Sequence, residues 1–461
     1  MGRRVTLLFT GLLVLTAGLL LSLGACGGGS STSPTQSPTA ASKIKHVVVI
    51  FQENRTPDNL FHGLPNADIA NSGVNSLGQT IPLAPESLVT TYDLGHGHPA
   101  FTLMYDNGKM DGADQIPVNC PPGVTGCAPA NPQFYYVNPS EVDSYFQLAE
   151  QYTFGDRMFQ TNQGPSFPAH QFIISGTSAP TATSNLFAAG NPFNPPNNLS
   201  GINGCISDPM SYVFMVDPAG NETTTQFPCF EHATLTDLLN AKGISWRYYA
   251  PNAGSIWTGP NAIQHMCVPS GNNCTGPDWV NHVVIPQTQV LTDIASGQLQ
   301  QVSWVMPDNL SSDHALGNTG LGPSWVASVV NAIGTSQYWS DTAIFITWDD
   351  WGGWYDHVAP KVINSYEFGF RVPLIVVSPY AKAAFVSHAQ HDFGSILKFI
   401  EEVNGLGTIS PGMPYADVAA DDFSDCFNFS QTPLPFKMIP AQFDASHFPN
   451  DHKPHGDPDD D

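Results

Sequence analysis

The sequence predicts an α/β protein built as a three-layer α/β/α sandwich around a mostly parallel sheet. First, short apolar runs rich in β-branched residues recur along the chain, as in strands buried on both faces. Second, amphipathic helical patterns separate these runs, and the repeated strand–helix–strand order is typical of parallel sheets. Third, 41 Gly and 40 Pro without a strict period predict many long surface loops.

The predicted strands are short and strongly apolar. The first, residues 46–51, is an unbroken run that stops at the polar sequence Gln52-Glu53-Asn54-Arg55. Later runs of the same kind follow helical segments, which is the pattern of crossover connections. The further strands expected are residues 244–249, 302–306, 343–348 and 374–377.

Three helices are marked by their ends. Thr234 caps the first, with Asp237 three residues on, and Gly243 ends it. Ser324 is expected to cap a second helix that stops at Gly334. The third is amphipathic, with apolar positions between Ile396 and Val403, and closes at Gly405. The apolar face of the second consists of Val326, Val329, Val330 and Ile333.

Of the 461 residues, residues 43–445 are expected to form one domain with long loops, since large α/β proteins often pack this much chain around one sheet. Stretches around residues 180–230 and 250–290, crowded with Asn, Pro and Gly, are expected to be insertions. Residues 446–461 are expected to form a solvated acidic tail. No internal repeat is visible.

The N-terminus has the pattern of an export signal over residues 1–26. Two arginines precede an apolar stretch from Val5 to Leu23. Cys26 follows Leu-Gly-Ala, which resembles the lipobox of bacterial lipoproteins, where the cysteine is acylated; plain cleavage and an uncleaved anchor stay open. Residues 27–42 are expected to be a flexible linker. We therefore expect export to the bacterial envelope or medium, with membrane attachment only through a lipid on Cys26.

The charge balance restricts the partners. With 15 Lys+Arg against 39 Asp+Glu, the formal net charge is -24. Nucleic acid is excluded as an expected partner, because binding it requires clustered cations. An anionic substrate such as a phosphate ester would be repelled unless a bound cation reversed the local field.

Seven cysteines lie beyond Cys26, and in an oxidising compartment short-range pairs are the economical choice. That choice leaves Cys426 single, although the sequence alone does not settle the connectivity. No cysteine spacing indicates a zinc site. The pairs expected are Cys120 with Cys127, Cys205 with Cys229, and Cys267 with Cys274.

Two of the most apolar strands end in acids. Glu53 and Asn54 follow the first strand, and Asp349 and Asp350 follow residues 343–348. Ligands of open α/β sheets bind at the carboxyl ends of strands, so these side chains are candidates for one crevice. Carboxylates packed together repel each other unless a hard cation lies between them. Taken alone, each acidic pair is better explained as the polar turn that follows a strand.

Several ordered blocks resemble one family. The run from Lys45 to Arg55, with Asp58, Phe61 and Gly63 behind it, resembles the opening of the bacterial phosphoesterase family that contains non-specific phospholipases C and certain secreted acid phosphatases. The resemblance extends over residues 43 to 435. Its further blocks are residues 93–96, 107–112, 164–168, 174–177, 348–358, 369–373 and 378–380.

The resemblance implies an alkaline-phosphatase-like fold and one divalent metal ion, with calcium, magnesium, manganese, zinc and iron all open. Ser166 would be both a ligand and the nucleophile that forms a phosphoserine. His96 and His314 would line the pocket and act as catalytic and substrate-binding groups, and His265 is a weaker third candidate for substrate binding. His357 is interpreted as structural, and the remaining histidines as surface residues. The implied metal ligands are Glu53, Asn54, Ser166, Asp349 and Asp350.

Two positions depart from the family pattern. Asp350 stands where the family often has Glu, and Ala169-His170 stand where it usually has Asn-Arg. The missing amide puts the choice of substrate in doubt. The sequence nevertheless predicts an exported, metal-dependent phosphoric ester hydrolase of the phospholipase C or acid phosphatase type, acting on a small-molecule or phospholipid phosphate ester.

The same sequence features leave two other functions open. A sulfatase or phosphonate-type hydrolase could use the same fold, but the segment from Ser166 to His170 lacks the arginine of the sulfatase motif. A surface binding protein that kept the fold and lost turnover is the non-enzymatic alternative.

Overall fold

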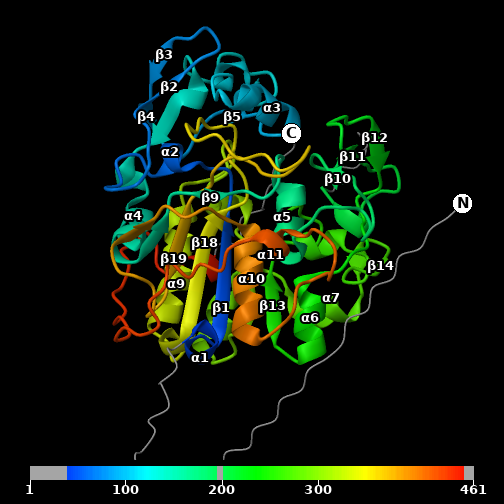
Figure 1. Ribbon diagram of the computed structural model, residues 1–461, viewed down its shortest axis with the longest axis vertical. Coiled ribbons are helices and arrows are strands. Elements are labelled where there is room, and N and C mark those ends of the chain that lie inside the picture. The colour runs from blue at the N-terminus through cyan, green and yellow to red at the C-terminus, as the bar shows by residue number, and fades with distance from the viewer. Residues whose placement is uncertain (1–38, 195–200, 451–461) are drawn as a thin grey trace, which may run out of the picture. The chain divides into compact units, whose positions relative to one another are not determined.

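The computed structural model describes residues 39–194 and 201–450. Its centre is an eight-stranded sheet with the order β16-β13-β17-β1-β18-β19-β8-β20 (Figure 1). The strands are β1 (His46–Gln52), β8 (Thr153–Gly155), β13 (Trp246–Tyr249), β16 (Val283–Val284), β17 (Val302–Val305), β18 (Thr342–Trp348), β19 (Leu374–Val377) and β20 (Phe385–Ser387).

The sheet is mixed but mostly parallel, which confirms the prediction. Strands β16, β13, β17, β1 and β18 run parallel to their neighbours in that order. Strand β19 is antiparallel to both β18 and β8, and β8 and β20 are parallel. A parallel connection needs a crossover, usually a helix, and residues 349–373 contain neither a helix nor a strand. The chain therefore returns in the opposite direction at β19.

The register of the two central strands fixes the position of their polar ends. β1 pairs with β18 over its whole length, from His46 opposite Thr342 to Gln52 opposite Trp348. Glu53 and Asp349 are the next residues on each strand, and Asp349 N donates to Gln52 O over 2.8 Å. The two acids thus leave the sheet side by side at its carboxyl edge, as predicted from the strand ends.

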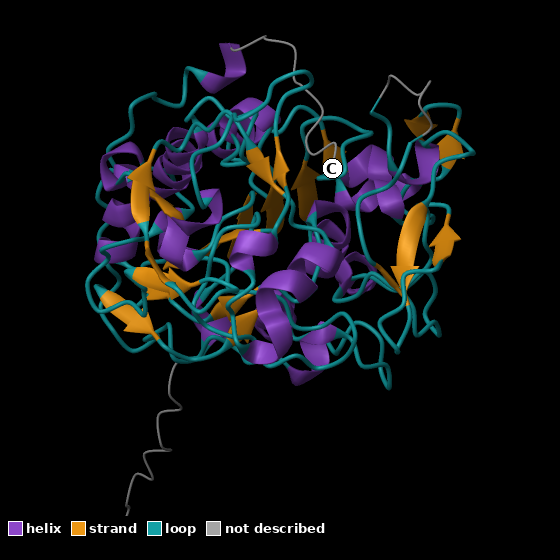
Figure 2. Ribbon diagram, turned by 90° about the horizontal axis from the view of Figure 1, so that it is seen from above, coloured by secondary structure: helices purple, strands orange, loops and turns teal. Residues whose placement is uncertain are grey.

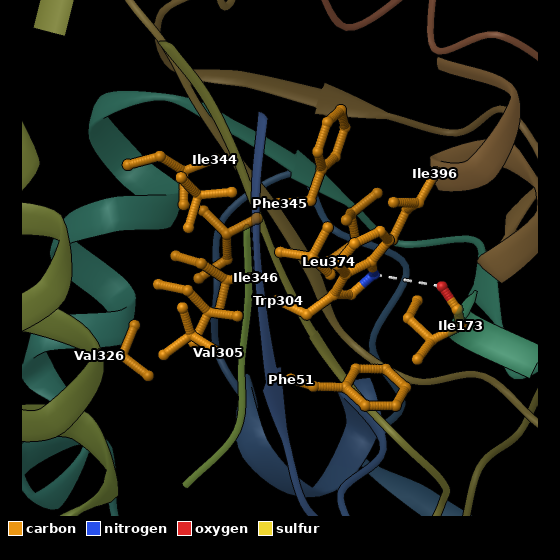
Figure 3. Packing of buried hydrophobic residues seen from close by; sticks show 14 of the residues in the cluster. Phe51, Ile173, Trp304, Val305, Val326, Ile344, Phe345, Ile346, Leu374 and Ile396 are labelled. Carbon is orange, nitrogen blue, oxygen red and sulfur yellow. Dashed lines mark hydrogen bonds between the residues drawn. The ribbon is translucent and has the colours of Figure 1, made fainter. Parts of the chain in front are cut away.

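Helices cover both faces of the sheet. On one face Val326, from a helix, lies against Val305, Ile344 and Ile346, whereas on the other face Ile173 and Ile396 lie on the side of Trp304 and Phe345 (Figure 3). Trp304 Nε1 also donates to Ile173 O over 3.3 Å, which ties the sheet to the helix behind it. One layer contains α4 (Asp143–Gln151), α8 (Gln289–Ala295) and α9 (Gly322–Gly334), and the other contains α5 (Ser166–Ser175), α6 (Leu235–Lys242) and α10 (Phe393–Asn404).

Shorter elements surround the sheet. Several small strands lie at the periphery in the view from above (Figure 2), and β2, β4, β5 and α3 lie above the carboxyl ends of β1 and β18 (Figure 1). The short helices are α1 (Ala40–Lys43), α2 (Pro57–Leu60), α3 (His98–Tyr105), α7 (Pro277–His282) and α11 (Ala416–Ala419). The short strands are β2 (Ser72–Val74), β3 (Thr80–Pro82), β4 (Ala84–Glu86), β5 (Asp93–Leu94), β6 (Val118–Asn119), β7 (Tyr135–Val137), β9 (Met158–Phe159), β10 (Phe187–Ala188), β11 (Val213–Val216), β12 (Thr224–Gln226), β14 (Pro269–Ser270), β15 (Asn273–Cys274) and β21 (His391–Asp392).

The helix ends follow the sequence signals with one exception. α6 carries the expected capping box of Thr234 and ends at Gly243. α10 ends at Gly405, as expected. The prediction that Ser324 caps α9 is wrong, because the helix begins at Gly322, with Pro323 in its first turn. Proline is favoured at the start of a helix, since its fixed φ suits the first turn and it has no N–H to satisfy.

The expected N-terminal segments fall largely outside the described residues. The export signal of residues 1–26 lies there entirely, as do most of the linker and residues 451–461 of the acidic tail. The last linker residues belong to helix α1. Within the described ranges, every helix is too short or too polar to cross a bilayer.

The disulfide prediction is confirmed. The pairs Cys120–Cys127, Cys205–Cys229 and Cys267–Cys274 form, and Cys426 is buried as a free thiol. The second and third pairs pack with Ile206 and Trp279 in a small cluster of their own, outside the main core. Covalent links thus reinforce loop-rich regions that bury little apolar surface.

Candidate active site

Backbone N–H groups that follow β1 and β18 hold the carboxylate of Asp349 in place. Asn54 adopts a left-handed conformation, with a φ of 63°, which asparagine tolerates better than most residues. Its N–H donates to Asp349 Oδ1 over 3.0 Å, and the N–H of Asp350 donates to the same oxygen over 2.7 Å. Two backbone donors therefore fix one oxygen of Asp349, and its other oxygen, Oδ2, is buried without a hydrogen-bond partner among the described residues.

Helix α5 brings the candidate nucleophile to these acids. Ser166 is its first residue, directly after Pro165 in extended conformation, and its side chain is fully buried. Ser166 Oγ lies 3.4 Å from Glu53 Oε2 and donates to it. Because the N-terminus of a helix carries partial positive charge, a negative charge that develops beside Ser166 is stabilised there.

His170 lies one helical turn after Ser166 and joins the same cluster. Its Nε2 is 3.3 Å from Glu53 Oε1 and 4.0 Å from Asp349 Oδ2. The sequence interpretation of this histidine as a surface residue is wrong, since its side chain is fully buried. The i, i+4 spacing from Ser166, which places both side chains on one face of a helix, was the signal that could have found it.

The protonation of His170 follows from its other neighbour. Tyr248 Oη donates its proton to Trp257 O over 2.8 Å, so it accepts from His170 Nδ1, 3.3 Å away. Burial lowers the pKa of His170 to about 4 although the charge of Asp349 opposes the shift, so the ring is neutral at neutral pH. Its Nε2 then carries a lone pair that faces Glu53 and Asp349.

His96 orients the amide of Asn54. Since a carbonyl oxygen only accepts, His96 Nδ1 donates to Leu94 O over 2.7 Å, and Nε2 accepts from Asn54 Nδ2 over 3.0 Å. The amide oxygen of Asn54 is buried and has no hydrogen-bond partner among the described residues. The structure thus shows His96 in contact with Asn54, which it positions, whereas its catalytic and substrate-binding roles stay predictions from the sequence.

The strand β1 also positions the loop that carries His314. Gln52 Nε2 donates to Ser311 O and Gln52 Oε1 accepts from Asp313 N, both over 3.1 Å. The buried guanidinium of Arg55 donates to Asp313 O over 3.0 and 2.7 Å. His314 Nδ1 in turn donates to Ala315 O, and the His314 ring centroid lies 5.9 Å from that of His96.

His96 and His314 border a pocket of about 680 Å³ with a largely apolar wall. Ser166 and Glu53 do not line this pocket and are fully buried. Apolar residues of the wall include Pro99, Ala100, Leu103, Pro117, Pro121 and Leu316.

His265 and Asp350 do not join the cluster of Glu53, Ser166, His170 and Asp349 in the way that the sequence predicted. His265 hydrogen-bonds Glu231 over 2.9 Å and lies 3.5 Å from Asp237, and none of its contacts in the described chain reaches the acids around Ser166. We therefore leave it out of the proposed substrate site. Asp350 is buried behind Asp349, where its Oδ1 accepts from Gly352 N over 2.7 Å.

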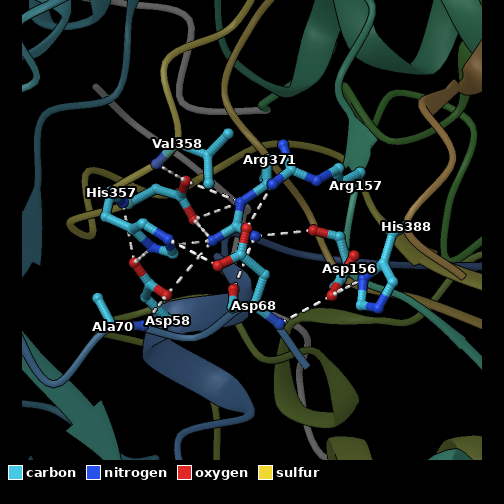
Figure 4. A network of polar contacts seen from close by, with 10 residues as sticks. Asp58, Asp68, Ala70, Asp156, Arg157, His357, Val358, Arg371 and His388 are labelled. Carbon is cyan, nitrogen blue, oxygen red and sulfur yellow. Dashed lines mark hydrogen bonds and ion pairs between the residues drawn. The ribbon is translucent and has the colours of Figure 1, made fainter. Parts of the chain in front are cut away.

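A buried ionic network connects the segments that follow Asn54 and Asp350. Arg371 pairs with Asp356 through Nε at 2.9 Å and reaches Asp58 Oδ1 at 3.3 Å (Figure 4). His357 contacts Asp58 Oδ2 at 2.8 Å and Asp68 Oδ1 at 3.1 Å, so it has the structural place expected from the sequence. Burial alone would lower the pKa of His357, but the hydrogen bond and charge of Asp58 raise it to about 9. The network ties helix α2, after Asn54, to the chain that follows Asp350.

The donor set around Ser166 fits a divalent cation. Glu53, His170 and Asp349 offer three ligand atoms that all lie within 4.8 Å of one another. Bonds of about 2.0–2.2 Å to nitrogen and oxygen place adjacent ligand atoms about 3–3.5 Å apart and opposite ones about 4.2 Å apart. The observed separations of 3.3 and 4.0 Å lie near these values. A cation would also satisfy Asp349 Oδ2 and the amide oxygen of Asn54.

Comparison with known proteins identifies relatives. The model of the Phosphoesterase family matches residues 44–407. The non-hemolytic phospholipase C of Burkholderia pseudomallei is 23% identical over 86% of this chain and 61% of its own length. Phospholipase C B of Mycobacterium tuberculosis is 22% identical over 92% of this chain and 85% of its own length. This chain thus spans about three fifths of the Burkholderia relative.

A solved structure of a protein in the alkaline phosphatase superfamily from Vibrio parahaemolyticus aligns with a TM-score of 0.37 and 12% identity, covering 83% of this chain and 70% of that one. The match of the family model extends from the start of β1 to beyond α10 and includes every residue of the cluster around Ser166. The chain belongs to the Phosphoesterase family.

Proposed function

We propose that the chain is a metal-dependent phosphoric ester hydrolase with Ser166 as its nucleophile. The observation that carries this proposal is the buried cluster in which Ser166 Oγ lies 3.4 Å from Glu53 Oε2, beside Asp349 and His170. Glu53, Asn54, Asp349 and His170 would hold the cation, with Asp350 behind them. These ligands suit hard and borderline divalent ions, and metal analysis of the purified protein would identify the cation.

The reaction follows from the positions of the protein groups. A bound divalent cation would supply positive charge that lowers the pKa of the Ser166 hydroxyl and neutralises the phosphoryl oxygens. Ser166 Oγ attacks phosphorus and passes its proton to Glu53 Oε2, while the bond from phosphorus to the leaving oxygen breaks. His314, which lines the pocket and whose Nδ1 proton is held by Ala315 O, acts in its doubly protonated form and gives its Nε2 proton to the leaving oxygen. Water then attacks the phosphoserine and gives one proton to His314 Nε2, and Ser166 Oγ leaves with the proton held by Glu53.

The pocket supports a phospholipid as the substrate. Its apolar wall suits an acyl glycerol group next to the phosphate, as in the named activity of the phospholipase C relatives. The net charge of -24 would otherwise repel an anionic ester, so local positive charge is required.

Export and domain organisation are parts of the same proposal. Three disulfides support folding in an oxidising compartment, which is consistent with an export signal over residues 1–26 and a lipid on Cys26. The catalytic domain would span residues 43–445, with the segments around 180–230 and 250–290 as insertions.

The test compares hydrolysis of phosphatidylcholine with that of a chromogenic phosphomonoester, with divalent ions and with chelator. We expect phosphatidylcholine to be cleaved and chelator to abolish the activity. Ser166→Ala should remove turnover, whereas Ser175→Ala, at the other end of helix α5, is the matched control that retains it. Failure of metal-loaded protein to cleave either ester would contradict the proposal and favour a binding protein.

A further inference from the structure

Cys426 lies in a C-terminal segment that is fastened to the edge of the central sheet. Its carbonyl oxygen accepts from Lys382 N over 2.9 Å and from Thr153 Oγ1 over 3.2 Å. Asn428 N donates to Tyr380 O over 2.9 Å a little further along. Residues 420–447 contain neither a helix of four or more residues nor a strand of two or more, and an isolated antiparallel bridge between Ala381 and Phe427 adds to the attachment.

Three different ligand types meet at this attachment. His391 Nε2 lies 3.8 Å from Cys426 Sγ and 3.6 Å from Asp425 Oδ1, and Sγ lies 3.5 Å from the same oxygen. Zinc bonds of about 2.3 Å to sulfur and about 2.0–2.1 Å to nitrogen or oxygen place ligand atoms about 3.3–3.6 Å apart at the tetrahedral angle. The three atoms therefore lie close to the corners of one face of a zinc tetrahedron.

The imidazole of His391 is oriented as in a metal site. Its Nδ1 lies 2.9 Å from both carboxylate oxygens of Asp421, which can only accept, so Nδ1 carries a proton. In the neutral ring Nε2 then presents its lone pair to Cys426 and Asp425. Asp421 is itself held by Ser395 Oγ, which donates over 2.6 Å. A carboxylate that fixes the far nitrogen of a histidine is the usual support of a zinc ligand.

The cluster is shielded but can be reached by an ion. Cys426 and His391 are buried, whereas the side chain of Asp425 is 33% exposed. His391 and Asp421 also border a pocket of about 430 Å³. Ser387 Oγ hydrogen-bonds Asp425 and lies 3.1 Å from His391 Nε2. This hydroxyl oxygen is therefore a candidate for the fourth ligand.

We propose that His391, Asp425 and Cys426 bind a zinc ion, with Ser387 Oγ or a water molecule in the fourth position. Binding releases to solvent the proton of the Cys426 thiol and any proton on His391 Nε2, and forms zinc bonds to sulfur, nitrogen and oxygen. The thiolate favours a soft or borderline ion over calcium or magnesium. The ion would clamp the C-terminal segment to the sheet edge, and the site is independent of the one at Ser166.

Cobalt substitution of the full chain tests this site separately from the active site. A thiolate bound to Co²⁺ gives a near-ultraviolet charge-transfer band, and the ligands around Ser166 include no sulfur. We expect the band in the wild type and in Asp422→Asn, the matched control in the same loop, and its loss in Cys426→Ser. Absence of the band in the wild type with excess Co²⁺, or its persistence in Cys426→Ser, would overturn the proposal.

Two milder variants guard against misfolding of the cysteine variant. Asp425→Asn, at a partly exposed position, should weaken zinc binding at least about tenfold, and Asp421→Asn should weaken it about 10–100-fold by releasing His391. A coloured zinc chelator in competition with the folded protein measures both affinities. Affinities equal to that of the wild type in both variants would contradict the assignment, whether or not the protein hydrolyses any ester.

Discussion

Replacement of Arg371 by methionine tests how the ionic network holds the candidate site. The guanidinium is fully buried and makes two bonds of 2.9 Å to the Asp356 carboxylate, through Nε and Nη2. Nη1 also donates to Asp68 O over 2.9 Å and to Asp156 O over 2.7 Å. Methionine has a similar length, so Arg371→Met removes the charge and the donors and leaves little empty space.

The expected loss in the free energy of unfolding follows from the two carboxylates that Arg371→Met leaves unpaired. Asp58 and Asp356 are both fully buried and would keep their charge or protonate without the arginine. Removal of one partner of a buried ion pair costs about 3–5 kcal/mol. Arg157 is the matched control, because its 2.6 Å pair with Asp68 involves side chains that are 37% and 34% exposed. Such a pair contributes about 0.2–1 kcal/mol.

Equilibrium unfolding in urea at pH 7, without reductant, measures both variants. We expect Arg371→Met to lower the free energy of unfolding by about 3–5 kcal/mol and Arg157→Met by less than about 1 kcal/mol. Equal losses for the two variants, or a loss below about 1 kcal/mol for Arg371→Met, would refute the view that this buried pair organises the chain behind the site.

Three further predictions concern stability and metal binding. The pKa of His357 is raised from 6.5 to about 9, so its contribution to stability is complete below about pH 6.5 and is lost as the pH rises through 9. The melting temperature of the wild type should therefore fall between these pH values. The fall should be smaller in His357→Gln. His170→Asn should weaken the binding of Mn²⁺ or Zn²⁺ in calorimetric titrations at least about tenfold, while the exposed His388→Asn should not; equal affinities would remove His170 from the ligand set. Loss of the disulfide between Cys205 and Cys229, which lie 24 positions apart, should lower the free energy of unfolding by about 3.5 kcal/mol, and unchanged urea midpoints would contradict this.

The parts of the fold that depend on local sequence could be predicted. The apolar runs of β1 and β18 and the caps of α6 and α10 are encoded by neighbouring residues. The meeting of Glu53 and Asp349 also followed, because adjacent parallel strands end at the same edge. Here the in-register pairing of two seven-residue strands makes the two acids neighbours.

What could not be predicted depends on contacts between distant segments. The reversal of β19 depends on the path of the loop after Asp350, which carries no periodic pattern. The burial of His170 depends on how α5 packs on β1, since its own sequence neighbours do not distinguish a core histidine from a surface one. Similarly, His391 and Cys426 lie 35 positions apart, and no short spacing connects them.

An anomalous-scattering map from crystals of the full chain loaded with Mn²⁺ or Zn²⁺ would locate the proposed cation directly. We expect an ion between Glu53, Asp349 and His170, about 2.0–2.2 Å from their ligand atoms and within reach of Ser166 Oγ. A fully loaded crystal with no ion at these residues, or with Ser166 turned away from it, would contradict the proposed mechanism.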